Sequence, residues 1–261
     1  TRGMRRVACG FACFIFTVAF VLPVIQLTLW AGQDIADLDT RYLGFVLRSL
    51  LLAASAALVI VAVSVLLAYI LRRLPSFFSA LVIRLATIGY AVPGTVLAVG
   101  VLVPIIFLSN TMQDLLRGWF GASAPILLFQ GTLIAVLFGY LARFLAVGFN
   151  PIESGLQRVT KSLDEAAIGL GVTGAQLLRQ VHVPLLRTSL ATAATLVFVD
   201  VMKEMPITLI VRPFGWDTLA IRVFEMTSEG EWERAALPSI AIVLAGLVPV
   251  ALLTRRGAHV G

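Results

Sequence analysis

The stretch SLDEAAIGLGVTGAQLLRQVHVP, from Ser162 to Pro184, is a polar segment between two long apolar parts of the sequence. Ser162 and Glu165 have the spacing of a capping box, in which a hydroxyl and a carboxylate bind free backbone amides at the start of a helix. Thr173 and Gln176 repeat that spacing further along the chain. The stretch therefore predicts two short helices.

Glycine and proline mark the expected ends of these two helices. Gly169 and Gly171 follow the first helix, and either residue can adopt the left-handed conformation that commonly ends a helix. Pro184 is expected to stop the second helix, because proline lacks an amide hydrogen and fits poorly in a helix interior. A short exposed helix either inserts into a groove on a partner protein or lies on lipid headgroups. The residues alone leave both possibilities open.

The composition of the whole chain is that of a membrane protein. The 261 residues are 59% hydrophobic and 13% charged, with a mean hydropathy of +0.99. A soluble domain carries about 25% charged residues. We therefore predict an all-α membrane protein, in which 1–261 form a single membrane domain. The net charge of +6 is attributed to Arg and Lys on cytoplasmic loops, so no nucleic-acid partner is expected.

Six apolar stretches approach the roughly 20 residues that a membrane-spanning helix needs. The predicted spans are Cys9–Trp30, Leu50–Ile70, Ala86–Leu108, Pro125–Leu145, Ser189–Val211 and Leu237–Leu253. The opening stretch then belongs to the longest loop, an insert of about residues 150–187 between the fourth and fifth spans. The third span contains Gly89, Pro93, Gly94 and Gly100, where small residues permit close helix contacts and the proline permits a kink.

The distribution of basic residues predicts the orientation of these spans. Twelve Arg and Lys residues fall on the side that holds both termini, and six fall on the other side. Because basic residues favour the cytoplasmic side, both termini and the insert are expected in the cytoplasm. Membrane lipid would then surround the spans.

The sequence contains no signature of catalysis or of a bound cofactor. The phosphate-binding pattern G-x-x-x-x-G-K-[ST] does not occur, so the chain is not expected to hydrolyse ATP by that route. Cys9 and Cys13 lie in an apolar run, and His182 and His259 stand alone in the sequence. We therefore predict no catalytic residue, no metal site and no cofactor in this chain.

The fifth predicted span carries three charged residues and then a proline. Asp200, Lys203 and Glu204 have the spacing of one helix face, and Pro206 follows. Charged groups within a membrane are costly and mark functional sites by default. They could form a buried ion-pair cluster that holds this helix to its neighbours, or an acidic pair that a cation meets in transit. A position closer to the outer membrane surface is the third possibility.

The opening stretch resembles the EAA motif of ABC-importer permeases, which reads E-A-A, three residues, G, nine residues, then I-x-L-P. Glu165, Ala166, Ala167, Gly171 and Pro184 occupy the corresponding positions, with valine in place of the Ile and the Leu. The resemblance implies the type I, MetI-like fold with six spans. It also implies that the insert is a coupling helix, which these five residues help to dock into a separate ATP-binding subunit that holds ATP and magnesium.

A second resemblance concerns the cargo. The run MKEMPITLIVRPFGWDTLA, from Met202 to Ala220, is similar to a run in ferric-iron ABC permeases. This similarity implies import of iron(III) delivered by a soluble binding protein, through a pathway completed by a second permease half. Both halves are commonly fused in that subfamily, so Thr1 in place of a starting methionine suits the C-terminal half of a longer chain.

Other functions are compatible with parts of the pattern. Permeases for thiamine, polyamines, phosphonates and oxyanions share the EAA motif. An ion-coupled secondary transporter could use Asp200 and Glu204 to carry protons or to bind a coupling ion, but it would have no ATPase for the insert to contact. A structural membrane scaffold would need neither the insert nor the charges.

Overall fold

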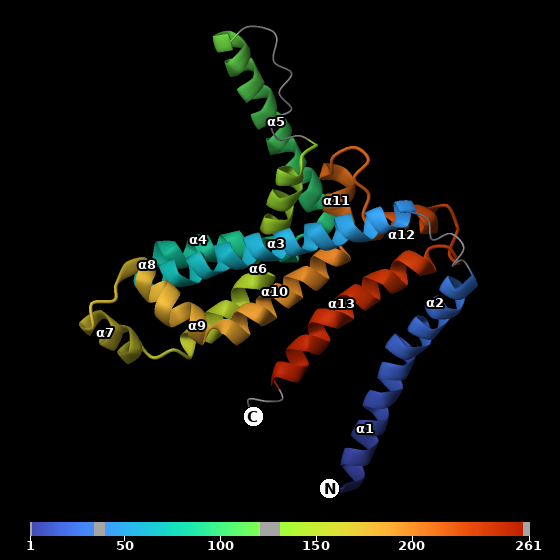
Figure 1. Ribbon diagram of the computed structural model, residues 1–261, viewed down its shortest axis with the longest axis horizontal. Coiled ribbons are helices and arrows are strands. Elements are labelled where there is room, and N and C mark those ends of the chain that lie inside the picture. The colour runs from blue at the N-terminus through green and yellow to red at the C-terminus, as the bar shows by residue number, and fades with distance from the viewer. Residues whose placement is uncertain (1, 34–39, 121–130, 258–261) are drawn as a thin grey trace.

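The computed structural model describes residues 2–33, 40–120 and 131–257, which fold into a bundle of helices (Figure 1). The helices are α1 Arg2–Phe16, α2 Leu22–Gln33, α3 Thr40–Arg73, α4 Phe77–Thr87, α5 Gly94–Phe120, α6 Leu133–Gln157, α7 Lys161–Gly169, α8 Gly174–Leu177, α9 Val183–Leu185, α10 Arg187–Met202, α11 Pro206–Val211, α12 Leu219–Ser228 and α13 Ala236–Gly257. Short π-helical turns, η1 Thr17–Val21 and η4 Leu178–His182, join α1 to α2 and α8 to α9, and a 3-10 turn, η3 Ile88–Ala91, follows α4.

The predicted all-helical membrane class is confirmed. Within the described ranges, five helices are long and apolar enough to cross a membrane: Gly3–Gln33, Arg41–Arg73, Gly94–Trp119, Leu133–Gln157 and Ala236–Leu253. A sixth is added if the pair Gly174–Leu185 and Arg187–Met202, bent by 79°, counts as one span. The first, second and last of these helices extend beyond the predicted spans, because hydropathy locates the apolar part of a helix and not its ends.

Helices α3, α6 and α10 form the centre of the bundle. Their facing side chains are fully buried, as Ile60 of α3, Tyr140 of α6 and Val197 of α10 illustrate. The outward faces of the helices carry many exposed leucines, valines and phenylalanines, as expected for surfaces in contact with lipid. Close van der Waals packing therefore holds these helices together, because lipid is as apolar as the side chains themselves.

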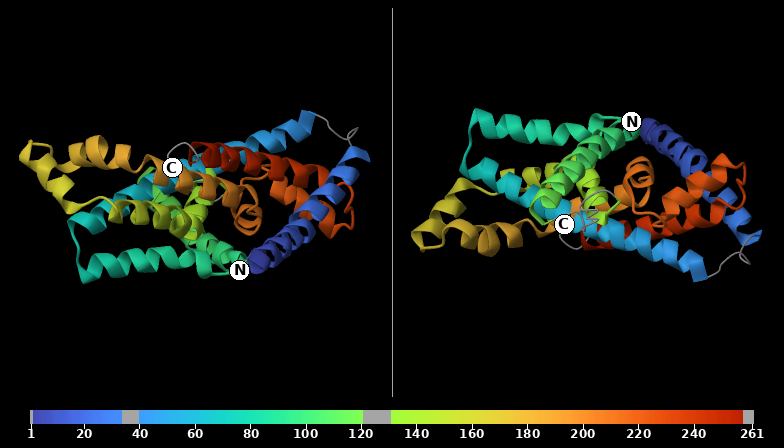
Figure 2. Two further views of the ribbon diagram at one scale, coloured as in Figure 1. Left: turned by 90° about the horizontal axis from the view of Figure 1, so that it is seen from below. Right: turned by 90° about the horizontal axis from the view of Figure 1, so that it is seen from above.

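The insert and α12 lie at opposite ends of the molecule. In Figure 1, α7 and α8 lie at one end of the long axis, and α12 lies at the other; the two views of Figure 2 show the same separation. α3 runs between the two ends, and α10 leads from the insert towards α11. The fold thus provides two long connections between the insert and the rest of the bundle.

The third predicted span, Ala86–Leu108, is wrong in its start. Residue Val92 is extended, with φ −81° and ψ 136°, and α5 begins only at Gly94. The cause is Pro93, because its ring disfavours the helical conformation in the residue before it. The proline therefore precedes the helix and does not kink it. The preceding α4 begins at a capping box formed by Ser76 and Ser79.

The fourth predicted span ends too early. Its first predicted residues, 125–130, lie outside the described residues, and α6 continues past Leu145 to Gln157. Pro151 lies inside this helix without ending it. The first residues of the predicted insert, 150–157, are therefore part of α6, and the insert proper begins near Arg158, the residue that ends the helix.

The fifth predicted span, Ser189–Val211, is two helices and not one. α10 ends at Met202, Lys203 is the residue that follows it, and α11 begins at Pro206. Pro206 causes this break, since it has no amide hydrogen for a continuous helix and suits the first turn of a new one. Glu204 consequently lies outside both helices, so the prediction that it shares a helix face with Asp200 is wrong.

Candidate functional site

The first helix of the insert begins two residues earlier than the capping box predicts, because a cap at Ser162 would make Leu163 the first helical residue. α7 starts at Lys161 after Thr160, and no side chain caps this end. The Ser162 hydroxyl lies 3.0 Å from the Thr160 hydroxyl instead of capping the helix. Glu165 is exposed on α7, so the predicted reciprocal pair of Ser162 and Glu165 is absent.

The end of α7 follows the glycine prediction. Gly171 has a φ of +84°, the left-handed region that only glycine adopts readily. The Gly171 amide donates to the carbonyl of Ile168, and the Val172 amide donates to that of Ala167, both at 2.9 Å. These two bonds are the Schellman arrangement that satisfies the last carbonyls of a helix. Gly171 therefore turns the chain, whereas Gly169 is the last helical residue.

The second helix of the insert also starts without the predicted cap and continues past Pro184. Thr173 precedes α8 but its side chain makes no capping bond. Helical structure then runs through η4 into α9, which contains Pro184 and ends at Leu185. Pro184 follows the wide π turn and lies in the first turn of α9, where its missing amide hydrogen is tolerated. The chain bends by 79° between Leu185 and Arg187, so the expectation that Pro184 ends this helix is wrong.

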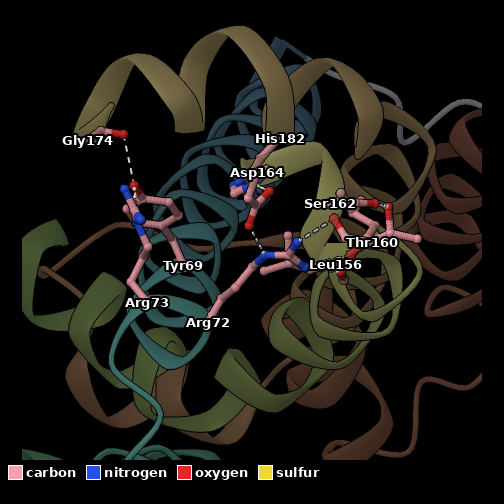
Figure 3. A network of polar contacts seen from close by, with 10 residues as sticks. Tyr69, Arg72, Arg73, Leu156, Thr160, Ser162, Asp164, Gly174 and His182 are labelled. Atoms are coloured by element: carbon pink, nitrogen blue, oxygen red, sulfur yellow. Dashed lines mark hydrogen bonds and ion pairs between the residues drawn. The ribbon is translucent and has the colours of Figure 1, made fainter. Parts of the chain in front are cut away.

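Arg72, near the end of α3, binds the insert directly (Figure 3). Its Nε donates to Oδ2 of Asp164 at 2.7 Å. Its Nη1 donates to the carbonyls of Leu156 and Val159, at 2.8 and 2.9 Å, and its Nη2 donates to that of Thr160 at 3.2 Å. One guanidinium thus joins α3 to the end of α6, to the residues between α6 and α7, and to the first turn of α7.

His182 completes this contact from the other side. It is fully buried, and its Nε2 lies 2.8 Å from Oδ1 of Asp164. Burial raises the pKa of the Asp164 carboxyl, but the hydrogen bonds from Arg72 and His182 outweigh burial and leave that pKa below its ordinary value. Asp164 is therefore a carboxylate at neutral pH. A further bond of 2.8 Å runs from the Tyr69 hydroxyl to the Gly174 carbonyl (Figure 3).

We define Arg72, Asp164 and His182 as the insert clamp. The clamp was not predicted from the sequence, although neighbouring residues were singled out. His182 stands alone in the sequence, and Arg72 is one of the twelve basic residues that were used only to predict the orientation of the spans. The three residues are brought together by the fold alone, so no spacing in the sequence marks them.

The outer surface of the insert carries exposed apolar side chains beside the motif residues. Glu165 and Ala166 are exposed, whereas Ala167 is buried against the rest of the fold. Leu170 is 85% exposed, and Leu163 and Ile168 are also exposed. The second half of the insert, α8 and η4, carries a shallow pocket of about 460 Å³. Its lining residues are Ala175, Gln176, Arg179 and Gln180. A polar loop that presents leucines to solvent has the character of a docking surface.

The four candidate pathway residues meet at a second pocket, of about 410 Å³. Its lining residues are Tyr90, Arg143, Phe144, Asp200, Lys203, Glu204 and Pro206. We call it the charged pocket. It lies where η3, α6 and the break between α10 and α11 converge. The sequence prediction that Asp200, Lys203 and Glu204 form one site is compatible with this arrangement, although they reach it from a broken helix.

Each carboxylate of the charged pocket already has partners. Oδ1 of Asp200 lies 2.9 Å from Nζ of Lys203, and Oδ2 lies 3.5 Å from the Tyr90 hydroxyl. The carboxylate of Glu204 accepts from the amides of Ile207 and Thr208 at 3.2–3.3 Å, so it caps the start of α11. Glu204 thus has a clear structural role in addition to its position at the pocket.

Arg143 is the charged residue of this pocket that sequence analysis missed. Its Nε lies 3.9 Å from Oε1 of Glu204, and its guanidinium also lies over the Phe144 ring at 5.6 Å. Charged residues inside a membrane span mark functional sites by default, which is why Asp200 was singled out. Arg143 meets the same condition, because it falls inside the predicted span Pro125–Leu145. All four charged residues that fall within the predicted spans therefore line one pocket.

Comparison with known sequences identifies relatives of this chain. Residues 60–256 match the family model described as binding-protein-dependent transport system inner membrane component. The Fe(3+)-transport system permease protein FbpB 2 of Haemophilus influenzae is 24% identical over 257 residues, which cover 97% of this chain and 47% of that protein. The putative 2-aminoethylphosphonate transport system permease protein PhnV of Salmonella typhimurium is 30% identical over 132 residues, 51% of this chain and 50% of PhnV. The chain spans about half the length of these relatives.

Solved structures share the fold. A chain of a bacterial alginate ABC transporter, in complex with an alginate pentasaccharide-bound periplasmic protein, superimposes with a TM-score of 0.74. The superposition covers 99% of this chain and 96% of that one, at 13% sequence identity. A second structure of a bacterial ABC transporter involved in alginate import gives a TM-score of 0.71 at 14% identity. Similarity at this level of identity establishes the architecture alone.

Proposed function

Because the chain belongs to the family of binding-protein-dependent transport system inner membrane components, we propose that it forms one half of the membrane pathway of an ATP-driven importer. It is a multi-pass inner membrane protein with the type I ABC importer fold, and it is a transport component, not an enzyme. Its proposed partners are a second permease half, fused or separate, and a soluble binding protein outside the membrane. Both termini are proposed to lie in the cytoplasm.

The insert is the proposed contact with a separate ATP-binding subunit, which would bind and hydrolyse ATP with magnesium. The observation that carries this proposal is the exposed face of α7, where Glu165 and Ala166 stand beside Ile168 and Leu170. Small and apolar side chains at the centre of a surface permit close contact, and an adjacent charge gives it orientation. Gly171 and the buried Ala167 would hold this face in position, and Pro184 would belong to the helix that leads to the bend before α10.

Iron(III) is the proposed cargo. The support is the match over nearly the whole chain to a relative named as an Fe(3+)-transport permease, together with the run from Met202 to Ala220. A phosphonate is the second candidate, because PhnV is more similar over the half of the chain that it matches. The charged pocket, with its Asp200, Lys203, Glu204 and Pro206, is proposed to line the route that the cargo takes.

Reconstitution in liposomes tests this function. The chain would be combined with its second half, the ATPase and the binding protein loaded with radioactive iron. We expect uptake that requires ATP and stops without the binding protein. Uptake driven by a proton or sodium gradient in the absence of ATP would show a secondary transporter instead. ATP-dependent uptake of 2-aminoethylphosphonate with no uptake of iron would reassign the cargo and retain the importer.

Replacing Glu165 by lysine should weaken the contact with the ATPase. Reversal of a charge at an interface opposes association, and we expect about tenfold less ATPase to co-purify with the membrane subunits. Glu165 is exposed, so the fold and the thermal stability should remain as in wild type. Glu229→Lys is the matched control, since Glu229 is exposed at the end of α12, far from the insert. Equal recovery of ATPase with both variants would contradict the docking role.

A further inference from the structure

We propose that the charged pocket binds an oxyanion group of the cargo through Arg143 and Lys203. The group is a phosphonate or a carboxylate that crosses the membrane as the cargo or together with it. This inference rests on the proposed import function, and it concerns what chemistry the pathway accepts. It follows from how the four charges of the pocket are already paired.

The two carboxylates have little capacity left for a cation. Glu204 is 5% exposed, and its carboxylate oxygens accept from two amides of α11 and from the Thr208 hydroxyl. Asp200 holds Lys203 at 2.9 Å. A metal cation would have to displace these partners and would stand beside two positive side chains. The pocket is therefore a poor cage for a bare cation.

Arg143 is in the opposite situation, because its positive charge is poorly compensated. Its Nε and Nη1 are buried without a hydrogen-bond partner, and the oxygen of Glu204 that lies 3.9 Å from Nε is shared with the Ile207 amide. Unpaired buried donors are costly, and more so when the group is charged. Arginine stays protonated under all ordinary conditions, and its planar fork suits the two oxygens of a carboxylate or phosphonate.

The surroundings of Arg143 keep the guanidinium at the pocket. A Cβ added to Gly94 would lie 2.5 Å from Nη1 of Arg143, so the missing side chain at this position makes room for the guanidinium. Lys203 supplies a second cation, whose side chain is 63% exposed and makes its ion pair with Asp200 alone among the described residues. Tyr90 and Phe144 complete the wall, and about 410 Å³ is enough room for a small oxyanion.

Both cargo candidates are compatible with such a site. A phosphonate is itself an oxyanion. Iron(III) is a hard cation that binds oxygen ligands, and it would pass the pocket with anionic oxygen ligands attached. In both cases an oxyanion lies beside Arg143. The choice of probes below distinguishes an oxyanion that is the cargo from one that accompanies iron.

Saturation-transfer NMR on the assembled transporter in lipid nanodiscs tests the proposal without requiring transport. The probes are methylphosphonate, citrate and, as a small organic cation that also carries C–H protons, tetramethylammonium. We expect signal transfer to one or both anions and none to tetramethylammonium. Transfer to methylphosphonate alone assigns the oxyanion to the cargo itself, and transfer to citrate alone assigns it to a ligand that accompanies iron. Transfer to neither anion, or equal transfer to the cation, would overturn the proposal.

Variants then locate the binding. Arg143→Gln removes the charged fork and should weaken anion binding about tenfold, the loss of one charge-assisted hydrogen bond. Lys203→Gln should weaken it less and changes an exposed side chain, so it remains informative if Arg143→Gln does not fold. Arg84→Gln, an exposed change of the same type on α4, should bind as wild type. Wild-type binding by both Arg143→Gln and Lys203→Gln would place the anions elsewhere and refute the site.

The two proposals fail in different ways. Iron uptake with ATP but no anion binding would refute the oxyanion site and leave the importer intact. Anion binding that depends on Arg143, in a transporter that shows no ATP-dependent uptake, would refute the importer and leave the site. Each experiment therefore gives its own answer.

Discussion

Replacing Arg72 by glutamine is expected to release the insert from α3 and to lower ATP-driven uptake at least tenfold. Arg72 makes the ion pair with Asp164 and donates to three backbone carbonyls, and its side chain is only 13% exposed. Removal of one partner from such a pair costs about 3 kcal/mol, because the carboxylate is left without its counter-charge. Glutamine is too short and uncharged to replace these bonds. The insert should then open locally while the central helices stay folded.

Hydrogen–deuterium exchange and uptake together measure this effect. Exchange should accelerate in residues 160–182 of Arg72→Gln, and uptake per ATP hydrolysed should fall, because motion of the proposed ATP-binding subunit would no longer be passed to α3. Arg73→Gln is the matched control, since Arg73 is the next residue on the same helix and, within the described part of the chain, its side-chain hydrogen bond and its ring contact are both to Tyr69 and not to Asp164. We expect Arg73→Gln to retain normal uptake.

A double-mutant cycle separates the clamp from a general effect of charge. Asp164→Asn alone should also weaken the insert, since it removes the acceptor that Arg72 and His182 share. The double variant should be less damaged than the sum of the two single variants, because the same interaction is lost in both. Additive effects, or rapid exchange confined to regions outside the insert, would count against a clamp.

The features of this fold that could be predicted depend on local patterns in the sequence. Span length and hydropathy indicated the membrane helices, and Gly169 and Gly171 indicated a left-handed turn after the first helix of the insert, which Gly171 adopts. Both patterns depend on residues close together in the sequence. Such patterns do not depend on contacts with distant residues, which explains why the all-helical membrane class was predicted correctly, whereas the start of the insert was placed inside α6.

The errors arose where distant residues or prolines decide the structure. Asp164 is 92 residues from Arg72 in the sequence, so the clamp depends on how α3 lies beside the insert. Ser162 had the spacing of a cap, yet Arg72 donates to the Thr160 carbonyl and α7 begins two residues earlier than that cap predicts. Pro93 directly precedes α5 and Pro206 is the first residue of α11, and hydropathy merged both helices with the segments before them. The break at Pro206 is also what frees Glu204 to cap α11.

α10 connects the two sites that the structure defines. It begins after the bend at Leu186, beside the insert, and ends at Met202, beside the charged pocket. α3 joins the insert through Arg72 and packs against α10 along the bundle. A displacement of the insert by an ATPase would therefore be carried to the pocket by two packed helices, which move as rigid bodies more readily than they deform.

Replacing Gly89 by alanine is expected to disrupt the charged pocket through its backbone. A Cβ at Gly89 would lie 1.9 Å from the carbonyl oxygen of Ala142, the residue before Arg143 in α6. The added Cβ and the carbonyl oxygen are both fixed by the backbone, so η3 and α6 must move apart. Overpacking of this kind costs about 3 kcal/mol. For a domain of this size the melting temperature should fall by roughly 6–12 °C.

Gly100→Ala is the matched control for this change, because a Cβ at Gly100 meets nothing within 4 Å. It should keep the wild-type melting temperature or raise it slightly, since alanine favours a helix over glycine by about 1 kcal/mol. The sequence placed Gly89 and Gly100 in one span and gave no reason to distinguish them. Their difference arises because η3 touches α6 at Gly89, which sets Tyr90 and Arg143 on adjoining walls of the same pocket. A wild-type melting temperature for Gly89→Ala, measured in the purified chain, would show that these walls are not held by that contact.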